Sequence, residues 1–364
     1  MKDPRPDLVG LMPSEMEVLA EAWGQPRYRG RQLFGWVHAR GCRDFTAMTN
    51  LGRPFRALVA ERARIGRAEI ERVQQARDGT RKFLLRLEDG EEIESVLIPD
   101  AGRLTACISS QAGCPLACRF CLTGLMGMRR NLTAAEIVGQ ILLLNDALAR
   151  EQRISNIVLM GMGEPLLNFP QVERALTILA DPQGTAVSPR RITVSTAGYV
   201  PGIRKLAASE LGVNLAVSLS ATTDSVRDGI MPINRRWPIA ELLAACRDYP
   251  LPHRRRLSFE YVLLDGVNDT PADARRLIRL LHGLRCKVNL IPFNTSPDLP
   301  DRPSPPERVE AFRQILLDAG FTATLRESRG WDISAACGML RAANRPPQAE
   351  PAAGAAEAAF AALD

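Results

Sequence analysis

The stretch SSQAGCPLACRFC, residues 109–121, places Cys114, Cys118 and Cys121 in a CxxxCxxC spacing. An apolar, strand-like run over residues 104–110 leads directly into this cysteine loop. Three thiolates on one loop can each bind one iron of a cubane [4Fe–4S] cluster, and they leave the fourth iron without a protein ligand. The segment therefore predicts a reactive iron–sulfur site on the first loop of the core.

Two other kinds of cysteine site are alternatives to this one. A closed structural zinc site needs four ligands, and the three histidines of the chain, His38, His253 and His282, all lie far in sequence from Cys114, Cys118 and Cys121. An electron-transfer cluster of the ferredoxin type also uses four cysteines. Zinc is the plainer alternative, but the spacing favours a cluster with one open iron.

Strand-like and helical segments alternate beyond residue 104. The strand-like runs cover 104–110, 154–160, 191–196, 213–219, 257–264, 287–292 and 322–326, and helical patterns cover 134–149, 171–179, 239–248, 272–284 and 306–319. This alternation predicts an α/β fold with a parallel sheet or barrel. In such folds the active site lies at the carboxyl ends of the strands.

The residues before this core divide into two parts. Amphipathic patterns over 13–23, 29–40 and 51–63 predict short helices, and alternating runs over 81–87 and 92–98, joined by Asp89 and Gly90, predict a hairpin. We expect four segments: a helical N-terminal module (1–65), a β-hairpin extension (66–103), the core with a C-terminal loop (104–345) and a disordered Ala-, Pro- and Glu-rich tail (346–364).

Composition excludes several classes of protein. The 364 residues are 46% hydrophobic and 24% charged, with a net charge of +6, which is ordinary for a folded globular protein. No apolar run approaches the ~18 residues of a membrane span, and residues 1–10 carry no apolar segment typical of a secretion signal. We therefore expect a cytoplasmic protein, in which a cluster among the eight cysteines serves metal binding or catalysis, whereas Cys42, Cys246 and Cys286 are expected to be packing residues.

A second motif, GMGEPL over residues 161–166, ends the second strand of the core. Its glycines allow the backbone to approach a ligand closely, and the carboxylate of Glu164 can accept a hydrogen bond from an ammonium group. The plainer interpretation is a tight turn between a strand and a helix. The motif lacks the third glycine of a dinucleotide-binding loop.

With these motifs, the chain resembles the radical S-adenosylmethionine (SAM) enzymes, and within them the RlmN family of RNA methyltransferases, over residues 15–340. The family resemblance rests on the cluster loop, the GMGEPL segment and a set of shorter segments. These are RQLFGW (31–36), MTNL (48–51), DGTRK (78–82), IESVLIP (93–99), SPRR (188–191), MPIN (231–234), GVND (266–269), NLIPFN (289–294) and DISAACG (332–338).

The resemblance implies a partial (β/α)6-type barrel that holds one [4Fe–4S] cluster on Cys114, Cys118 and Cys121 and binds SAM. It implies methylation of C2 of a specific adenosine in 23S rRNA and of adenosine 37 in tRNAs, with two SAM molecules and an S-methylcysteine intermediate. It also implies an electron donor such as flavodoxin, no membrane partner and a monomer. A Cfr-like enzyme that methylates C8 is the alternative.

Three residues outside the cluster loop acquire catalytic roles through the resemblance. Cys337 carries the methyl group, Cys107 releases the product through a disulfide, and Glu94 takes the C2 proton. Without the resemblance, a lone cysteine on a strand is more often a small buried hydrophobe, and an alternating glutamate more often faces solvent.

The resemblance also assigns contacts with SAM. The family commonly has histidine where this chain has Ser220, and glutamine where it has Met339. An RNA-binding relative without turnover is the alternative that these departures suggest, and a radical SAM enzyme for a small molecule is another. The expected SAM-binding residues are Gly163, Glu164, Ser195, Ser218, Leu219, Ser220 and Asn294.

Arginines supply the candidate RNA contacts, because a guanidinium suits phosphate. They occur in pairs along the core, and the alternative for each pair is a solvated surface. The N-terminal module is the better candidate for gripping RNA, through Arg27, Arg29, Arg31, Arg40, Arg43, Arg53 and Arg56.

Overall fold

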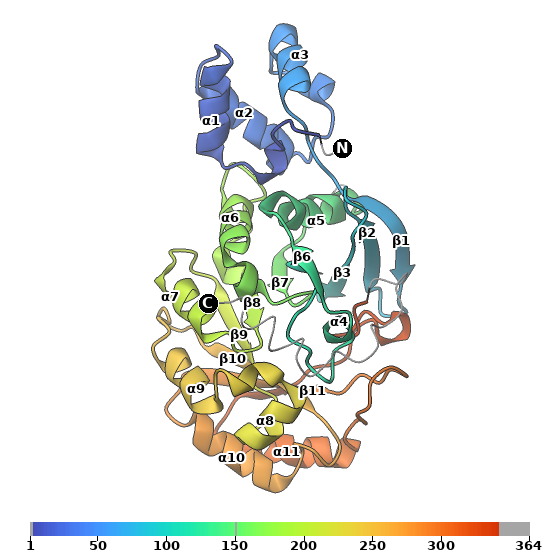
Figure 1. Cartoon of the computed structure of the whole chain (residues 1–364), viewed down its shortest axis with the longest axis vertical. Helices are drawn as coiled ribbons and strands as arrows, with labels where there is room; N and C mark the ends of the chain where they lie inside the picture. Colours follow the sequence, from blue (N-terminus) through green and yellow to red (C-terminus); the bar gives the residue numbers. More distant parts are fainter. Residues whose placement is uncertain (1–2, 150, 342–364) are drawn as a thin grey trace.

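A computed structural model describes residues 3–149 and 151–341, so the predicted tail over 346–364 lies outside the described residues. Its main feature is one ten-stranded sheet in which β1 to β4 are followed by β7 to β12 in chain order. Helices cover the outside of the curved sheet, and the N-terminal helices form a separate layer at one end (Figure 1). No helix among the described residues is long and apolar enough to span a membrane.

Seven consecutive strands of this sheet run parallel, as the alternating sequence pattern predicts. The predicted α/β partial barrel is therefore confirmed, and the sheet stays open because β12 is not hydrogen-bonded to β1 within the described part of the chain. The parallel strands are β4 (Arg103–Cys107), β7 (Asn156–Leu159), β8 (Ile192–Thr196), β9 (Asn214–Ser218), β10 (Leu257–Leu263), β11 (Cys286–Pro292) and β12 (Ala323–Leu325).

Two of the helices between these strands begin at a side-chain cap that the sequence supplies. Thr133 and Glu136 form a reciprocal capping box at the start of α5 (Ala134–Asp146), and Thr270 and Asp273 do the same for α10. Such caps satisfy backbone donors that the first helical turn leaves free. The remaining core helices are α4 (Leu122–Leu125), α6 (Phe169–Ala180), α7 (Val200–Ala208), α8 (Asp224–Ile230), α9 (Ile239–Arg247), α10 (Pro271–Leu281) and α11 (Pro306–Asp318).

Three antiparallel strands precede the barrel, where the sequence pattern predicts only a two-stranded hairpin. They are β1 (Glu69–Gln75), β2 (Arg81–Arg86) and β3 (Glu92–Asp100). Nearly every residue of β1 is exposed, so this edge strand has no apolar alternation by which the sequence could reveal it. Strand β3 pairs antiparallel with β4, and the extension is therefore continuous with the barrel.

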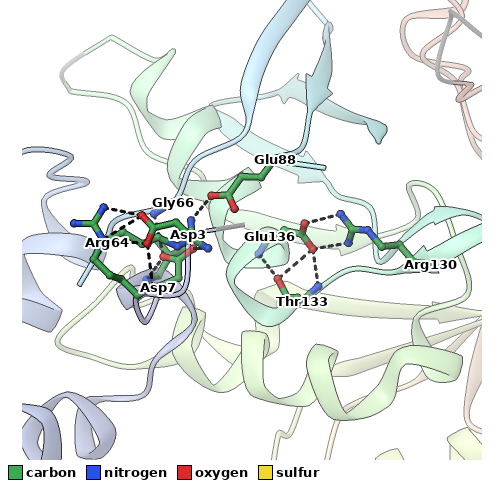
Figure 2. Close-up of polar contacts among 10 residues, drawn as sticks. Asp3, Asp7, Arg64, Gly66, Glu88, Arg130, Thr133 and Glu136 are labelled. Carbon is green, nitrogen blue, oxygen red and sulfur yellow. Dashed lines mark hydrogen bonds and ion pairs between the residues drawn. The ribbon is translucent and has the colours of Figure 1, made fainter. Parts of the chain in front are cut away.

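The N-terminal module contains α1 (Pro13–Ala22), α2 (Tyr28–Phe34) with a π-helical continuation over Gly35–Ala39, and α3 (Arg53–Arg62). An ion pair between Arg64 and Glu88 ties its end to the hairpin extension (Figure 2). Arg64 pairs with Asp7 and with Glu88, and Asp7 also accepts a hydrogen bond from the backbone of Gly66. Arg64 is thus neutralised by carboxylates.

Arg130, in β6, is neutralised in the same way by Glu136 (Figure 2) and by Asp89. Arg64 and Arg130 line one hollow between the module and the core, which Asp3 and Asp7 line as well. Because carboxylates surround these two guanidinium groups, this hollow is a poor site for RNA phosphate.

His38 makes the N-terminal module sensitive to acid. Its imidazole is 2% exposed and packs against Phe34, with ring centroids 4.3 Å apart. Burial, helped by the charge of Arg67, lowers the pKa of His38 from 6.5 to about 3. Below pH 6.5 the His38 imidazole therefore takes up a proton in the unfolded chain, whereas in the folded chain it does so only near pH 3. The free energy of unfolding should fall over this range, by at most about 1.4 kcal/mol per pH unit.

Replacing His38 with leucine should flatten this dependence in denaturant titrations at several pH values. The matched control is His282→Gln, because His282 is exposed. An equally steep fall in the His38→Leu protein would assign the acid sensitivity to other groups.

Candidate active site

One pocket lies at the carboxyl ends of the parallel strands and has a volume of about 940 Å³, its open mouth included. Residues from the cluster loop, from the GMGEPL turn and from the C-terminal segment all reach it. The residues that line it include Cys114, Cys118, Cys121, Met160, Gly163, Glu164, Ser195, Ser218, Glu260, Asn294, Arg326 and Cys337.

The loop that carries the three cysteines is shaped by a small separate sheet of β5 (Gln111–Gly113) and β6 (Met128–Asn131). Gly113 has a φ of +81°, and a Cβ atom there would lie 1.9 Å from the carbonyl oxygen of Gly127. Only glycine fits this close approach. The loop is thereby turned toward the pocket.

The donor set fits an iron–sulfur cluster. Burial raises the pKa of all three thiols, and for Cys114 and Cys118 the neighbouring cysteines add to the rise. Bound cations would hold such thiols as thiolates. Within residues 3–149 and 151–341, no three His, Cys, Asp or Glu side chains converge on one ion site. A cluster does not require that convergence, because each thiolate binds a different iron atom.

The GMGEPL turn presents a buried carboxylate to the same pocket. Glu164 accepts hydrogen bonds from the backbone nitrogens of Leu166 at 3.1 Å and Ala197 at 2.8 Å. Burial raises the pKa of Glu164 to about 7. Gly163 has a φ of +98°, and a Cβ atom there would lie 2.6 Å from Gln111 Cβ. The turn therefore needs its glycine to hold Glu164 in place.

Five of the seven expected SAM-binding residues line the pocket, namely Gly163, Glu164, Ser195, Ser218 and Asn294. Leu219 and Ser220 follow Ser218 directly but do not line it. Ser220 is fully buried with a φ of +50°, and its hydroxyl accepts a hydrogen bond from the backbone nitrogen of Val262 at 3.3 Å. Their contacts with SAM stay predictions.

The segment that carries Cys337 is held against the extension (Figure 1). Asp78, in the turn between β1 and β2, accepts a hydrogen bond from the backbone of Gly330 at 3.0 Å. Lys82 Nζ donates to the carbonyl oxygen of Ser334 at 3.1 Å. The three-stranded extension thus serves as a platform for the C-terminal segment.

Two further contacts place Cys337 itself. Its carbonyl oxygen accepts a hydrogen bond from Asn294 Nδ2 at 3.2 Å, and the carbonyl oxygen of Gly338 accepts one from the backbone of Leu122 at 2.7 Å. Leu122 follows the last cluster cysteine. Cys337 is therefore fixed between the cluster loop and the end of β11. Met339, a departure from the family pattern, is 8% exposed and packs in the core.

Cys107 and Cys337, although distant in sequence, lie close enough in the fold to interact electrostatically. Cys107 ends β4 and is 7% exposed, while Cys337 is half-buried and lines the pocket. Burial, with a further contribution from nearby Cys337, raises the pKa of Cys107 to about 12. The two thiols therefore share one electrostatic environment.

Glu94 lies on the same face of the sheet as Cys107. Val96 is opposite Cys107 in the β3–β4 pairing, and residues two apart on a strand point to the same side. The Glu94 carboxylate is 1% exposed, lies 3.0 Å from Lys82 Nζ and accepts a hydrogen bond from the backbone of Arg341 at 2.7 Å. Burial raises its pKa, and Lys82 opposes the rise. Glu94 does not line the pocket, so its role as a base stays a prediction.

Sequence reasoning gave no role to Lys82, Glu260 or Arg326. Lys82 and Glu260 are 6% and 4% exposed. Charged residues this buried are unusual unless they are paired. In the sequence, the only sign of a role for Lys82 and Glu260 was a charged residue within an apolar strand.

A cysteine loop at the carboxyl end of the first barrel strand, next to a buried carboxylate, defines a radical SAM site, and members of that class bind a [4Fe–4S] cluster and SAM. The model of the Radical SAM superfamily matches residues 108–281, and that of the ribosomal RNA large subunit methyltransferase N-terminal domain matches residues 6–65. The class of the protein is thus shown over most of the chain.

Curated relatives identify the family. The Rhodospirillum rubrum protein named dual-specificity RNA methyltransferase RlmN is 53% identical over 93% of this chain and 81% of its own length. The protein of the same name from Geobacter sulfurreducens is 52% identical over 92% of each chain. The chain belongs to the RlmN family of RNA methyltransferases.

A solved structure supports the same assignment. The crystal structure of a radical SAM methyltransferase from Sphaerobacter thermophilus is 48% identical, covers 93% of this chain and 99% of its own, and superposes with a TM-score of 0.88.

Proposed function

We propose that this chain methylates C2 of adenosine in 23S rRNA and in tRNA, with Cys337 as the carrier of the methyl group. The observation that carries the proposal is that Cys337 lines the same pocket as the cluster loop and five of the expected SAM-binding residues, and interacts electrostatically with Cys107. The double RNA specificity is supported by the names of the relatives.

The chemistry of the substrate explains why a carrier is needed. C2 of adenine is an electron-poor aromatic carbon, so it does not attack the methyl group of SAM as a nucleophile. When bound at Cys114, Cys118 and Cys121, the cluster with SAM supplies a 5′-deoxyadenosyl radical that abstracts hydrogen. Glu164, Ser195 and Ser218 line the pocket where SAM would be held.

Cys337 receives a methyl group from a first SAM and presents it in the pocket. After loss of one hydrogen atom, the methylene carbon on its sulfur bonds to C2, and protein and RNA become covalently linked. This adduct carries one unpaired electron that it must give up, and a cluster held by Cys114, Cys118 and Cys121 would accept that electron. Glu94 takes the C2 proton. Its burial favours the protonated form that results, while Lys82 keeps the carboxylate available beforehand.

Cys107 then frees the product. Its thiolate attacks the sulfur of Cys337, so that an S–S bond forms and the S–CH2 bond breaks. The electron pair of the broken bond passes to the carbon, which takes up a proton and becomes the methyl group. The disulfide must be reduced before the next cycle, which suits a reducing cytoplasm. A flavodoxin-like donor and a monomeric enzyme complete the proposal.

For RNA binding we favour only part of the arginine set of the N-terminal module. Arg27 and Arg31 pair with Glu17, and Arg43 pairs with Asp146. Four others form no ion pair with any described residue, and Arg40 stacks 4.2 Å over the ring of Trp36. Unpaired guanidinium groups have their charge available for phosphate. These four are Arg29, Arg40, Arg53 and Arg56.

Mass spectrometry of nucleosides tests the proposed function. The reconstituted enzyme, supplied with SAM, a reductant and either a 23S rRNA fragment or tRNA, should form 2-methyladenosine in both. Cys337→Ala should form none. If 8-methyladenosine were the main product, the Cfr-like alternative would be correct. If the protein bound iron, SAM and RNA but did not methylate the RNA, it would be a relative that has lost turnover.

A further inference from the structure

A row of hydrogen-bonded polar side chains crosses three neighbouring strands, and its first member, Glu260, lines the pocket. Glu260 of β10 lies opposite Asn289 of β11, which lies opposite Thr324 of β12. Thr324 Oγ1 donates to Asn289 Oδ1 at 2.6 Å, and Asn289 Nδ2 donates to Glu260 Oε1 at 2.7 Å. These bonds fix the orientation of the Glu260 carboxylate, and neither the cluster nor the SAM contacts described above account for them.

Arg326 lies next to Glu260, at one end of this row of side chains. Its Nη1 lies 3.9 Å from Glu260 Oε2 and donates to Met160 Sδ at 3.5 Å. The contact with Glu260 is long and involves one nitrogen, unlike the short bidentate pairs in which arginine is fully engaged. Glu260 therefore orients the guanidinium while leaving part of its charge for another anion.

The nearest candidates for that anion are the two thiols. Arg326 lines the pocket together with Cys337 and Met160. Nearby Cys337 and Cys107 both favour the charged form of Arg326 and raise its pKa, and Arg326 in turn opposes the rise in the pKa of Cys107. Arg326 is thus a cation that lines the pocket with Cys337 and interacts electrostatically with both thiols.

The release step creates a need for such a cation. A thiolate, not a thiol, attacks sulfur, but Cys107 is buried, and burial opposes its ionisation. The other charged groups around Cys107 give little help. Glu94 lies on the same face but is negative and is paired with Lys82, and the ionisable neighbour on the C-terminal segment is Cys337 itself.

We propose that Arg326, held by Glu260 and Asn289, is a positioning residue that stabilises the thiolate of Cys107 for the release of methylated RNA. The inference rests on the proposed function, because it concerns the step in which the Cys107 thiolate attacks the Cys337 sulfur. That thiolate forms by loss of the thiol proton to solvent. The remaining bond changes are those given for the release step above.

The test is a single turnover with Arg326→Met, followed by the amount of RNA covalently bound to protein. The variant should form 5′-deoxyadenosine at the normal rate but accumulate the protein–RNA adduct, because the release step slows by about ten- to a hundredfold when the cation is removed. Raising the pH should speed release in the variant as more thiolate forms. Arg326→Lys should restore release in part.

Matched variants separate charge from folding. Arg329→Met removes an arginine that pairs with Asp100 and Glu327 outside the pocket, and it should release RNA normally. The double variant Arg326→Met/Glu260→Gln avoids leaving a buried carboxylate without its cation, and it should accumulate the adduct as the single variant does.

The outcomes distinguish this inference from the proposed function. If Cys107→Ala traps RNA but Arg326→Met loses SAM cleavage, or releases RNA at the normal rate, the inference is overturned and the proposed function stands. If Cys107→Ala traps no RNA, the proposed function fails first.

Discussion

Replacing Cys107 with alanine is expected to leave the protein covalently bound to its RNA. Cys107 is the buried thiol that shares its surroundings with Cys337, and alanine at this position cannot attack the sulfur that links protein to adenine. The methylene bridge would form and then persist. Denaturing gel electrophoresis with labelled RNA should show a slow protein–RNA band, and free methylated product should fall by about a hundredfold or more.

The second thiol supplies the control for this experiment. Adding Cys337→Ala should abolish the adduct, because the carrier sulfur is gone. Cys246→Ala should behave as the unmodified protein in this assay, since Cys246 is buried in α9 away from the pocket. An adduct that survives in the Cys107→Ala/Cys337→Ala protein would show that another residue carries the bridge.

Replacing Cys118 with alanine is expected to remove the cluster and all turnover. The three cysteines of the cluster loop line the pocket, so the variant retains two thiolates for a cluster that already has one iron without a protein ligand. Loss of a partner that merely orients a metal ligand costs 10- to 100-fold in many sites, and loss of the ligand itself should exceed about 100-fold. Bound iron and 5′-deoxyadenosine formation measure the effect.

Cys42→Ala is the matched variant, because Cys42 is also half-buried but lies in the N-terminal module. It should keep its iron and its activity. Full iron content in the Cys118→Ala protein would contradict the proposed ligand set.

The sequence was sufficient where function depends on local spacing. The cluster loop and the GMGEPL turn each occupy one short segment, and both lie in the pocket as predicted. The alternation of strands and helices likewise gave the parallel part of the sheet. Local patterns of this kind survive because neighbouring residues remain neighbours in the fold.

The interactions that the sequence did not reveal join distant strands. Glu260 meets Asn289 only through the pairing of β10 with β11, and Arg326 reaches Met160 across the barrel. Lys82 meets Glu94 through the β2–β3 register. A single sequence does not specify which positions of two strands face each other. These pairs of residues are therefore visible only in the folded structure.

The expected contacts of Leu219 and Ser220 illustrate the same limit. Both follow a strand whose last residue, Ser218, lines the pocket. The positive φ of Ser220 turns the chain there, and its hydroxyl bonds to the backbone of Val262. Position at a strand end predicts nearness to the site, whereas the direction of each side chain depends on the local turn.

A pulse-label experiment tests most directly whether Cys337 carries the methyl group. The protein is first charged with SAM that bears a ¹³C-methyl group, and mass spectrometry should find that carbon on the peptide that contains Cys337. Excess unlabelled SAM, reductant and RNA are then added for one turnover. We predict that the first methyl group to appear on adenosine contains ¹³C, and an unlabelled methyl group in the first turnover would contradict the account.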